Sequence, residues 1–286
     1  MKDRIIDFRV RLPFKDEFPD ADPGDLSFVP HWMSHYVELY QAALKVDLGV
    51  ETLLASMEEN GIERAVMQAE WEFGDYKHLN NAVHKIVTKY PDKFIGFCTV
   101  HPEESKDMAA ELRDWIAAGM RGVNLQPWAY RMEAHDRRFY PVYEVANELG
   151  IPVTVHTSVN WTLNRPIFYG RPINLDVVAC DFPDLVLIAS HGGWPWVNEM
   201  VAVAWKHKNV YIETGAVSPK YIGRPGTGWE TFIQYADSIL KNQILYASEW
   251  PLLTFERVVA EAQALPLKEE VRRAYLYENA KRLLGI

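Results

Sequence analysis

Residues able to transfer protons or to bind anions follow a series of short apolar runs in this chain. Histidine titrates near neutrality, glutamate can act as an acid or a base, and arginine keeps its charge and donates several hydrogen bonds. Such residues at the ends of apolar runs indicate acid–base chemistry on an anionic compound. They are Arg9, Arg11, Glu70, His101, Gln126, His156, His191, Glu213 and Glu249.

The apolar runs alternate with helical patterns from one end of the chain to the other. Each run is short and largely apolar, as expected for parallel strands buried on both faces. The predicted strands are Ile5–Val10, Arg64–Ala69, Phe94–Val100, Gly122–Leu125, Pro152–Val155, Leu185–Ala189, Val210–Ile212 and Ile244–Ala247. The predicted helices are Val50–Asn60, His78–Tyr90, Glu104–Ala118, Tyr140–Leu149, Trp194–Lys206, Thr231–Lys241, Phe255–Leu265 and Lys268–Leu284.

Two architectures fit this order of elements, a closed barrel and an open doubly wound sheet. The open sheet usually carries a Gly-rich phosphate-binding turn after its first strand, whereas Arg11, Leu12 and Pro13 follow the first predicted strand here. We therefore predict one α/β domain over residues 1–286, a TIM (β/α)8-barrel. The carboxyl ends of barrel strands open on one face, so the polar residues should meet there.

The segment 12–48 interrupts this rhythm after the first predicted strand. Its aromatic and histidine residues suit a lid over the barrel mouth, and local packing of an insertion explains them equally well. Trp161, Trp194 and Trp250 follow later predicted strands closely and could line a pocket for a planar or apolar substrate. Packing of loop aromatics against one another is the competing explanation.

Composition and charge exclude several function classes. Of the 286 residues, 48% are hydrophobic and 24% are charged, which supports a folded core. The formal net charge of −9 argues against nucleic acid as a partner, because a phosphate backbone requires a basic face. The start lacks a signal-peptide pattern and no apolar run reaches roughly 18 residues, so we expect a cytoplasmic protein without membrane association. Cys98 and Cys180 lack metal-type spacing and are expected to be packed thiols.

Four segments at the ends of predicted strands resemble those of amidohydrolases. They are IIDFRVRLP at 5–13, GIPVTVHTS at 150–158, LVLIASHGGWPWV at 185–197 and ILYASEWPL at 244–252. Their order and spacing, together with the connecting text from FIGFCTVHPEE to YENAKRLLGI, extend the resemblance over nearly the whole chain. Within the superfamily the chain is similar to the amidohydrolase-2 branch, which contains aminocarboxymuconate-semialdehyde decarboxylase and γ-resorcylate decarboxylase.

The resemblance implies a metal site that this sequence has altered. In that family, the first-strand histidines, or a glutamate and a histidine, bind a divalent ion with a fifth-strand histidine and an eighth-strand aspartate. The matching positions here are Arg9, Arg11, His156 and Glu249. A guanidinium has no lone pair to donate, so neither arginine can ligate a cation. We expect no cofactor; the alternative is one zinc or manganese ion on His156, His191 and Glu249.

These residues predict a small-molecule enzyme that acts on a carboxylated cyclic or unsaturated compound. Hydrolysis of a lactone or amide and non-oxidative decarboxylation both fit, because a base would activate water and an acid would protonate the carbon that loses carbon dioxide. The residues assigned to catalysis are His156, His191 and Glu249, and those assigned to substrate binding are Arg9, Arg11, Glu70, Gln126, Trp161, Trp194 and Trp250. The expected partner is an anionic small molecule, and the branch suggests a homodimer.

Three other interpretations remain open at the level of sequence. The barrel could bind an anionic ligand without turnover, or use a metal in an altered ligand shell. The arginines could form a purely structural cluster that neutralises Asp7, Glu70 or Glu249. Finally, His101, Gln126 and Glu213 could each be an ordinary polar residue satisfied at a strand end.

Overall fold

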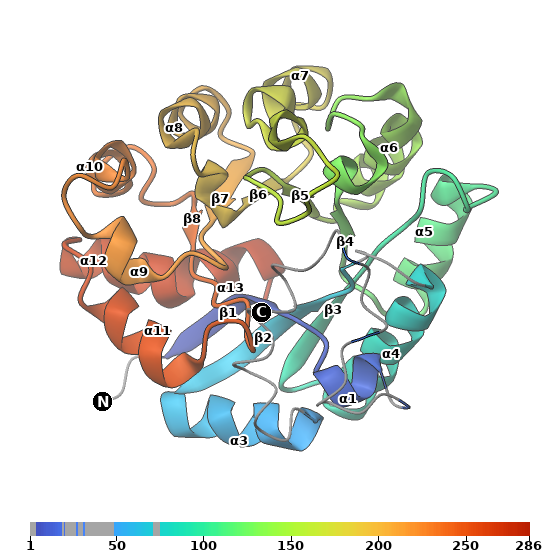
Figure 1. Cartoon of the computed structure of the whole chain (residues 1–286), viewed down its shortest axis with the longest axis horizontal. Helices are drawn as coiled ribbons and strands as arrows, with labels where there is room; N and C mark the ends of the chain where they lie inside the picture. The colour runs from blue at the N-terminus through green and yellow to red at the C-terminus, as the bar shows by residue number, and fades with distance from the viewer. Residues whose placement is uncertain (1–3, 19, 21–26, 28–30, 32–48, 71–74) are drawn as a thin grey trace.

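Strands and helices alternate around a central sheet in the computed structural model, which describes residues 4–18, 20, 27, 31, 49–70 and 75–286 (Figure 1). The sheet has eight strands, and each strand runs parallel to the next one in sequence. The strands are β1 (Ile5–Val10), β2 (Ile62–Gln68), β3 (Phe94–Cys98), β4 (Gly122–Leu125), β5 (Val153–His156), β6 (Leu187–Ser190), β7 (Val210–Glu213) and β8 (Ile244–Leu245). Most strand residues are buried, because helices cover the outside of the sheet.

Backbone hydrogen bonds close the sheet between its last and first strands. The Phe8 amide donates to the Tyr246 carbonyl at 2.9 Å, and the Glu249 amide donates to the Arg9 carbonyl at 3.0 Å. The predicted TIM (β/α)8-barrel is therefore confirmed, and the carboxyl ends of its strands share one mouth.

The helices form a ring outside the barrel (Figure 1). The α-helices are α1 (Phe14–Glu17), α3 (Val50–Asn60), α4 (Tyr76–Lys89), α5 (Met108–Ala117), α6 (Tyr140–Leu149), α7 (Ile173–Asp181), α8 (Val197–Lys206), α9 (Pro219–Ile222), α10 (Glu230–Ala236), α11 (Phe255–Gln263), α12 (Glu269–Arg273) and α13 (Asn279–Leu284). The 3₁₀ turns are η2 (Pro127–Tyr130), η3 (Arg137–Phe139), η4 (Ile167–Gly170) and η5 (His191–Gly193), and the π turn η6 (Ala274–Glu278) joins α12 to α13. Helices α3 and α6 end at Gly61 and Gly150, whose φ of 75° and 64° is a left-handed conformation that glycine adopts without strain.

Helix α13 packs against the starts of the strands. Its side chains Ala280 and Leu284 belong to one apolar cluster with Ile6, Ile95 and Ile188, each the second residue of its strand. The helix and the carboxyl terminus lie at the centre of the barrel in Figure 1. This packing closes the end opposite the mouth, which leaves the carboxyl ends of the strands for a site.

The structure differs from the sequence prediction at several boundaries. Helix α7 was not predicted, α8 begins at Val197 rather than Trp194, and α10 ends at Ala236 rather than Lys241. Residues 12–18 follow β1 and include α1, but most of the segment 19–48 lies outside the described residues, so the lid stays a prediction. Among the described residues, no helix combines the length and the apolar character needed to span a membrane.

Candidate active site at the barrel mouth

A buried ionic cluster occupies the carboxyl ends of strands that lie far apart in sequence. Arg9 belongs to β1 and Arg11 follows it, Glu70 lies beyond β2, Glu213 ends β7, and Glu249 lies beyond β8. All five side chains are buried. The structure thus brings together four residues predicted for the site and adds Glu213, a strand-end residue whose role the sequence left open. These five residues are called the mouth cluster below.

Arg9 is the centre of the mouth cluster. Its Nε donates to Glu213 Oε2 at 2.7 Å, its Nη1 donates to Glu70, and its Nη2 donates to Ser190 Oγ at 2.6 Å. Glu249 Oε2 lies 3.5 Å from Nε as a third acidic neighbour. With only 1% of its surface exposed, Arg9 serves as a fixed internal cation rather than as a group that reaches into solvent.

Arg11 contacts the carboxyl oxygens of Glu70 and Glu249 that do not face Arg9. Its Nη1 lies 3.1 Å from Glu70 Oε2 and 3.5 Å from Glu249 Oε1. The backbone between the two arginines is held in place as well, since the Arg11 amide donates to the Trp250 carbonyl at 2.9 Å. Both guanidinium groups therefore pair with Glu70 and Glu249.

The surroundings of Glu249 favour its uncharged form. Burial raises the pKa of Glu249 well above its usual range, and the nearby Glu70 carboxylate raises it further. Burial also opposes ionisation of Glu70, but the charges on Arg9 and Arg11 prevail and lower the pKa of that carboxyl. The two guanidinium groups therefore stabilise the charge of Glu70, while burial favours the uncharged form of Glu249.

The backbone at Glu249 is shaped by the buried Asp7. Asp7 Oδ1 accepts hydrogen bonds from the Arg9 amide at 2.9 Å and from the Ser248 amide at 3.1 Å. Glu249 itself has a φ of 66°, in the left-handed region that non-glycine residues seldom adopt. Asp7 thus fixes the turn that aims Glu249 at the arginines, and burial raises the pKa of Asp7 to about 7.

His191 is the proton acceptor that the site offers. Its Nδ1 lies 2.9 Å from the Gly215 carbonyl oxygen, and a carbonyl can only accept, so Nδ1 carries the proton and donates. Burial lowers the pKa of His191 below its ordinary value, which keeps the ring neutral. Nε2 therefore retains its lone pair, as a general base requires.

The two glycines after His191 are required by close packing. His191, Gly192 and Gly193 all have positive φ values, of 60°, 62° and 73°. A side chain on Gly192 would clash with the ring of Trp229, and one on Gly193 would come within 2.6 Å of Met200. The His-Gly-Gly sequence thus forms a tight turn that presents the imidazole at the mouth.

His156, at the end of β5, packs beside His191. The ring centroids of the two histidines are 4.8 Å apart, and Trp128 lies on the other side at 5.6 Å. Burial and the neighbouring His191 hold the pKa of His156 well below its usual value, so this ring is also neutral. Its buried Nδ1 has no hydrogen-bond partner among the described residues. His156 thus places an unsatisfied polar atom beside His191.

A cavity of about 550 Å³ opens next to His191. Trp161 and Trp194, both predicted to line a pocket, lie on its wall, and Trp229 faces them from the segment before α10. The remaining described wall residues are Ser158, Val159, Ala216, Val217, Ser218, Tyr221, Thr227, Leu253 and Arg257. The wall is mostly aromatic and aliphatic, as in sites for small organic molecules.

Several predicted site residues lie away from this wall. Trp250 is buried and stacks on Phe255 with ring centroids 6.3 Å apart, which favours the packing explanation for that tryptophan. Gln126 is buried at the start of η2 and does not line the cavity. His101 Nδ1 accepts from the amides of Glu103 and Glu104 at 3.2 and 3.1 Å, so it stabilises a local turn. His191 lines the cavity, whereas His156 and the residues of the mouth cluster do not.

Arg257 on α11 is a wall residue that sequence reasoning missed. Its Nε donates to Glu261 Oε1 at 3.0 Å and its Nη2 donates to Ser218 Oγ at 3.1 Å. It is the only arginine or lysine among the described residues of the wall. It lies on a helix rather than at a strand end, and an arginine four residues before a glutamate on a helix is an ordinary surface pattern, so no sequence signal singled it out.

The sequence model of the amidohydrolase family matches residues 32–286. The chain belongs to the amidohydrolase family. The matched region begins after β1, so Arg9 and Arg11 lie outside it. Membership places this protein among enzymes, and the arginines lie in the part that the family model leaves unmatched.

Solved structures repeat the whole barrel of this amidohydrolase. An uncharacterized TIM-barrel protein from Bordetella bronchiseptica is 28% identical, with a TM-score of 0.78 over 99% of this chain and 98% of that one. The 5-carboxyvanillate decarboxylase LigW from Sphingomonas paucimobilis is 16% identical, with a TM-score of 0.71 over 99% of both chains. A probable 2-pyrone-4,6-dicarboxylic acid hydrolase from Acinetobacter baumannii is 15% identical, with a TM-score of 0.66 over 100% of both. The last two, at these identities, establish the fold alone.

A curated relative matches part of this amidohydrolase. It is 2-keto-4-carboxy-3-hexenedioate hydratase from Sphingobium sp. (strain NBRC 103272 / SYK-6), 29% identical over 133 residues. The match covers 40% of this chain and 39% of the hydratase, so the chain aligns with well under half of that enzyme.

The residues of this amidohydrolase do not fit the divalent ion that the resemblance implies. Arg9 and Arg11 cannot ligate, and Arg9 Nε lies 3.5 Å from Glu249 Oε2, where its fixed charge would oppose a dication. In the described part of the chain, His156, His191 and Glu249 do not form a group whose ligand atoms approach one another closely enough to hold an ion. Arg9, a fixed guanidinium among carboxyl groups, therefore stands at a position to which the resemblance assigns a metal ligand.

Proposed function

We propose that this amidohydrolase adds water to a small carboxylated, cyclic or unsaturated compound, by hydrolysis or hydration, without a divalent ion at the barrel mouth. The observation that carries the proposal is the tautomer of His191. Because Nδ1 of His191 donates to the Gly215 carbonyl at 2.9 Å, Nε2 is the ring nitrogen whose lone pair is available, and His191 lines the cavity. It accepts a proton from water, and the hydroxide adds to a carbonyl carbon or to a double bond conjugated with a carboxylate. The proton held on Nε2 then passes to the leaving oxygen or nitrogen as its bond to the carbonyl carbon breaks, or, in hydration, to the carbon next to the carboxylate.

The mouth cluster acts on this base through electrostatics. Arg9 and Arg11 do not line the cavity and are already paired, so they act at a distance. The charge of Arg9 lowers the pKa of His191, and both charges offset negative charge that develops on the substrate. Two arginines supply a formal charge comparable with one dication. They supply it without coordination, which is why the site can dispense with the ion.

The cavity supports an aromatic or otherwise planar acid as substrate. Trp161, Trp194 and Trp229 offer flat apolar surfaces, and Arg257 offers a cation on the same wall. An arginine binds a carboxylate through charge-assisted hydrogen bonds, often in a bidentate manner. The partially matching relative is named as a hydratase of 2-keto-4-carboxy-3-hexenedioate, which is a carboxylated unsaturated keto acid. That name agrees with a carboxylated unsaturated substrate and with the addition of water.

Decarboxylation is a second candidate, favoured by one observation. Burial raises the pKa of Glu249 and so favours its protonated form, and a protonated carboxyl could supply the proton that replaces carbon dioxide. Glu249 does not line the described cavity wall, however, so the proton would have to pass through another group such as His191.

Turnover of a substrate panel in ¹⁸O-labelled water tests the proposal. The panel contains lactones, unsaturated keto acids and hydroxylated aromatic acids, with labelled product and released carbon dioxide both measured by mass spectrometry. The proposal expects ¹⁸O in a product and no carbon dioxide. Carbon dioxide without ¹⁸O would replace it with decarboxylation, and tight binding of acids with no turnover of any compound would leave a barrel that only binds.

A further inference from the structure

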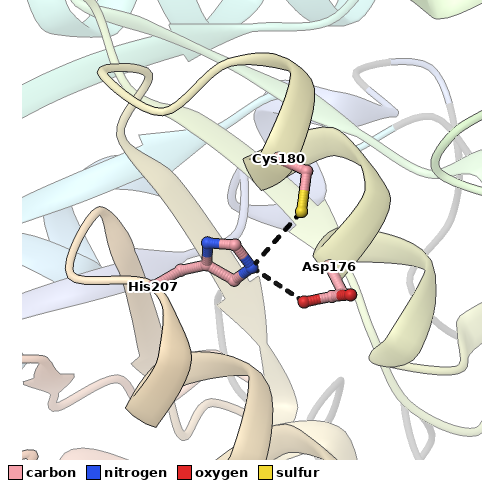
Figure 2. A group of neighbouring side chains, drawn as sticks. All are labelled: Asp176, Cys180 and His207. Atoms are coloured by element: carbon pink, nitrogen blue, oxygen red, sulfur yellow. Dashed lines mark hydrogen bonds and ion pairs between the residues drawn. The ribbon is translucent and has the colours of Figure 1, made fainter.

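Three different ligand-type side chains gather on the outside of the barrel, away from the mouth. Asp176 and Cys180 lie four residues apart on α7, and His207 directly follows α8 (Figure 2). His207 Nε2 lies 2.7 Å from Asp176 Oδ1 and 4.0 Å from Cys180 Sγ. Among the residues that the structure describes, this is the only group of three or more ligand atoms within 4.8 Å of one another.

We propose that Asp176, Cys180 and His207 form a binding site for a thiophilic divalent ion, with zinc as the physiological candidate. A thiolate, an imidazole and a carboxylate are the ligands that zinc takes in proteins, and three of them leave one position for water. Zinc–ligand distances of about 2.0–2.3 Å in a tetrahedron separate ligand atoms by roughly 3.3–3.6 Å. To reach that geometry, the distance from His207 Nε2 to Asp176 Oδ1 would have to lengthen from 2.7 Å by at least about 0.6 Å, and the distance from His207 Nε2 to Cys180 Sγ would have to shorten from 4.0 Å by at least about 0.4 Å.

The backbone holds two elements in the required register. Spacing of four residues places Asp176 and Cys180 on the same face of α7. His207 is fixed by its amide, which donates to the Val203 carbonyl at 3.0 Å, and by Gln243 Nε2, which donates to its carbonyl at 2.9 Å. The ligand set is therefore preformed by the packing of α7 beside α8, and a bound ion would link the two helices.

The ammonium group of Lys206 lies beside Asp176 and Cys180, where a bound metal ion would lie. Its Nζ lies 2.7 Å from Asp176 Oδ1 and 3.6 Å from Cys180 Sγ. Unlike the buried Arg9, Lys206 can leave its position: its side chain is 52% exposed and flexible, so its ammonium group can turn into solvent when an ion binds. Its presence marks the place as attractive to positive charge, and it makes Lys206 a competitor that a variant can remove.

Cadmium and zinc titrations of the full chain test the site. Cadmium should bind at one ion per chain with a thiolate-to-metal charge-transfer band in the ultraviolet, and zinc should displace it and slow alkylation of Cys180. The other cysteine, Cys98, is buried. Cys180→Ser should abolish the band. His207→Gln should weaken cadmium binding by at least about tenfold, because the loss of a residue that only hydrogen-bonds to a metal ligand already lowers metal affinity by about that factor.

Two further variants separate a ligand site from nonspecific binding. Lys206→Gln should strengthen cadmium binding, because it removes the competing charge without removing a ligand. Asp184→Asn, an exposed carboxylate nearby in sequence, should leave binding unchanged and serves as the matched control. Binding at one ion per chain that survives Cys180→Ser and His207→Gln would overturn the proposal, and so would binding that Asp184→Asn weakens as much as they do.

Discussion

Replacement of Arg9 by methionine tests whether this residue is the internal counter-charge of the barrel mouth. The variant keeps most of the side chain but removes the cation that donates to Glu213 at 2.7 Å and to Ser190 at 2.6 Å. Removing one partner of a buried ion pair costs about 3–5 kcal/mol of stability. Since three carboxyl groups face Arg9, we expect the upper end, about 5 kcal/mol, against a total of about 5–15 kcal/mol for a domain.

A second substitution should recover part of that loss. Arg9→Met with Glu213→Gln removes both members of the pair, so no unpaired charge remains between them. We expect the double variant to be more stable than Arg9→Met alone by about 1–3 kcal/mol, the range of coupling between residues in contact.

The deficit of Arg9→Met should also depend on pH. Arg9 and Arg11 hold the pKa of Glu70 below its usual value, so loss of Arg9 raises it in the folded state. A carboxyl group whose pKa is higher in the folded state than in the unfolded state stabilises the fold at pH values below its unfolded pKa. That stabilisation is lost as the pH rises through its folded-state pKa. The variant should therefore lie closest to the parent near about pH 4 and furthest from it near neutrality.

Urea unfolding followed by tryptophan fluorescence measures these differences. Arg4→Met is the control, because Arg4 forms an ion pair with Glu63 on an exposed surface and should change stability little. If Arg9→Met behaved like the control and showed no coupling to Glu213, the account of the mouth cluster would be refuted.

Three predictions concern catalysis and binding. His191→Gln should lower turnover by about 10²–10⁴-fold with little change in urea midpoint, and turnover by the parent enzyme should fall only below about pH 6.5, since the pKa of His191 is lowered. Glu249→Gln should change stability by less than about 1 kcal/mol because burial favours the uncharged form of Glu249, whereas Glu70→Gln should cost about 3 kcal/mol. Arg257→Met should raise KM for a carboxylated substrate about tenfold with kcat nearly unchanged, and equal KM values for parent and variant would remove Arg257 from the site.

The barrel could be predicted from sequence because its signals are local. Short apolar strands alternate with helices, and glycines such as Gly61 and Gly150 end helices where a left-handed residue is needed. Helix α7 escaped prediction because Ile173 and Val177 point outward with 44% and 39% of their surface exposed, so no apolar stripe marks the buried face.

The candidate site could be predicted only in part. Strand-end position located Arg9, Arg11 and His191 correctly at one mouth, since barrel topology decides that outcome. Which carboxyl groups pair with Arg9 depends on side-chain reach across the barrel, and its partner Glu213 lies 204 residues away. Arg257 lines the cavity from helix α11, and an inference based on strand ends cannot identify a residue on a helix.

Metal content and activity measured together on one protein test the central claim most directly. The Cys180→Ser variant is the appropriate sample, because it removes the proposed outer metal site and leaves the barrel mouth intact. After dialysis against a chelator, we predict far less than one zinc or manganese ion per chain and turnover equal to that before dialysis. Turnover that disappears with the metal and returns when zinc or manganese is restored would contradict the claim that arginines replace the ion.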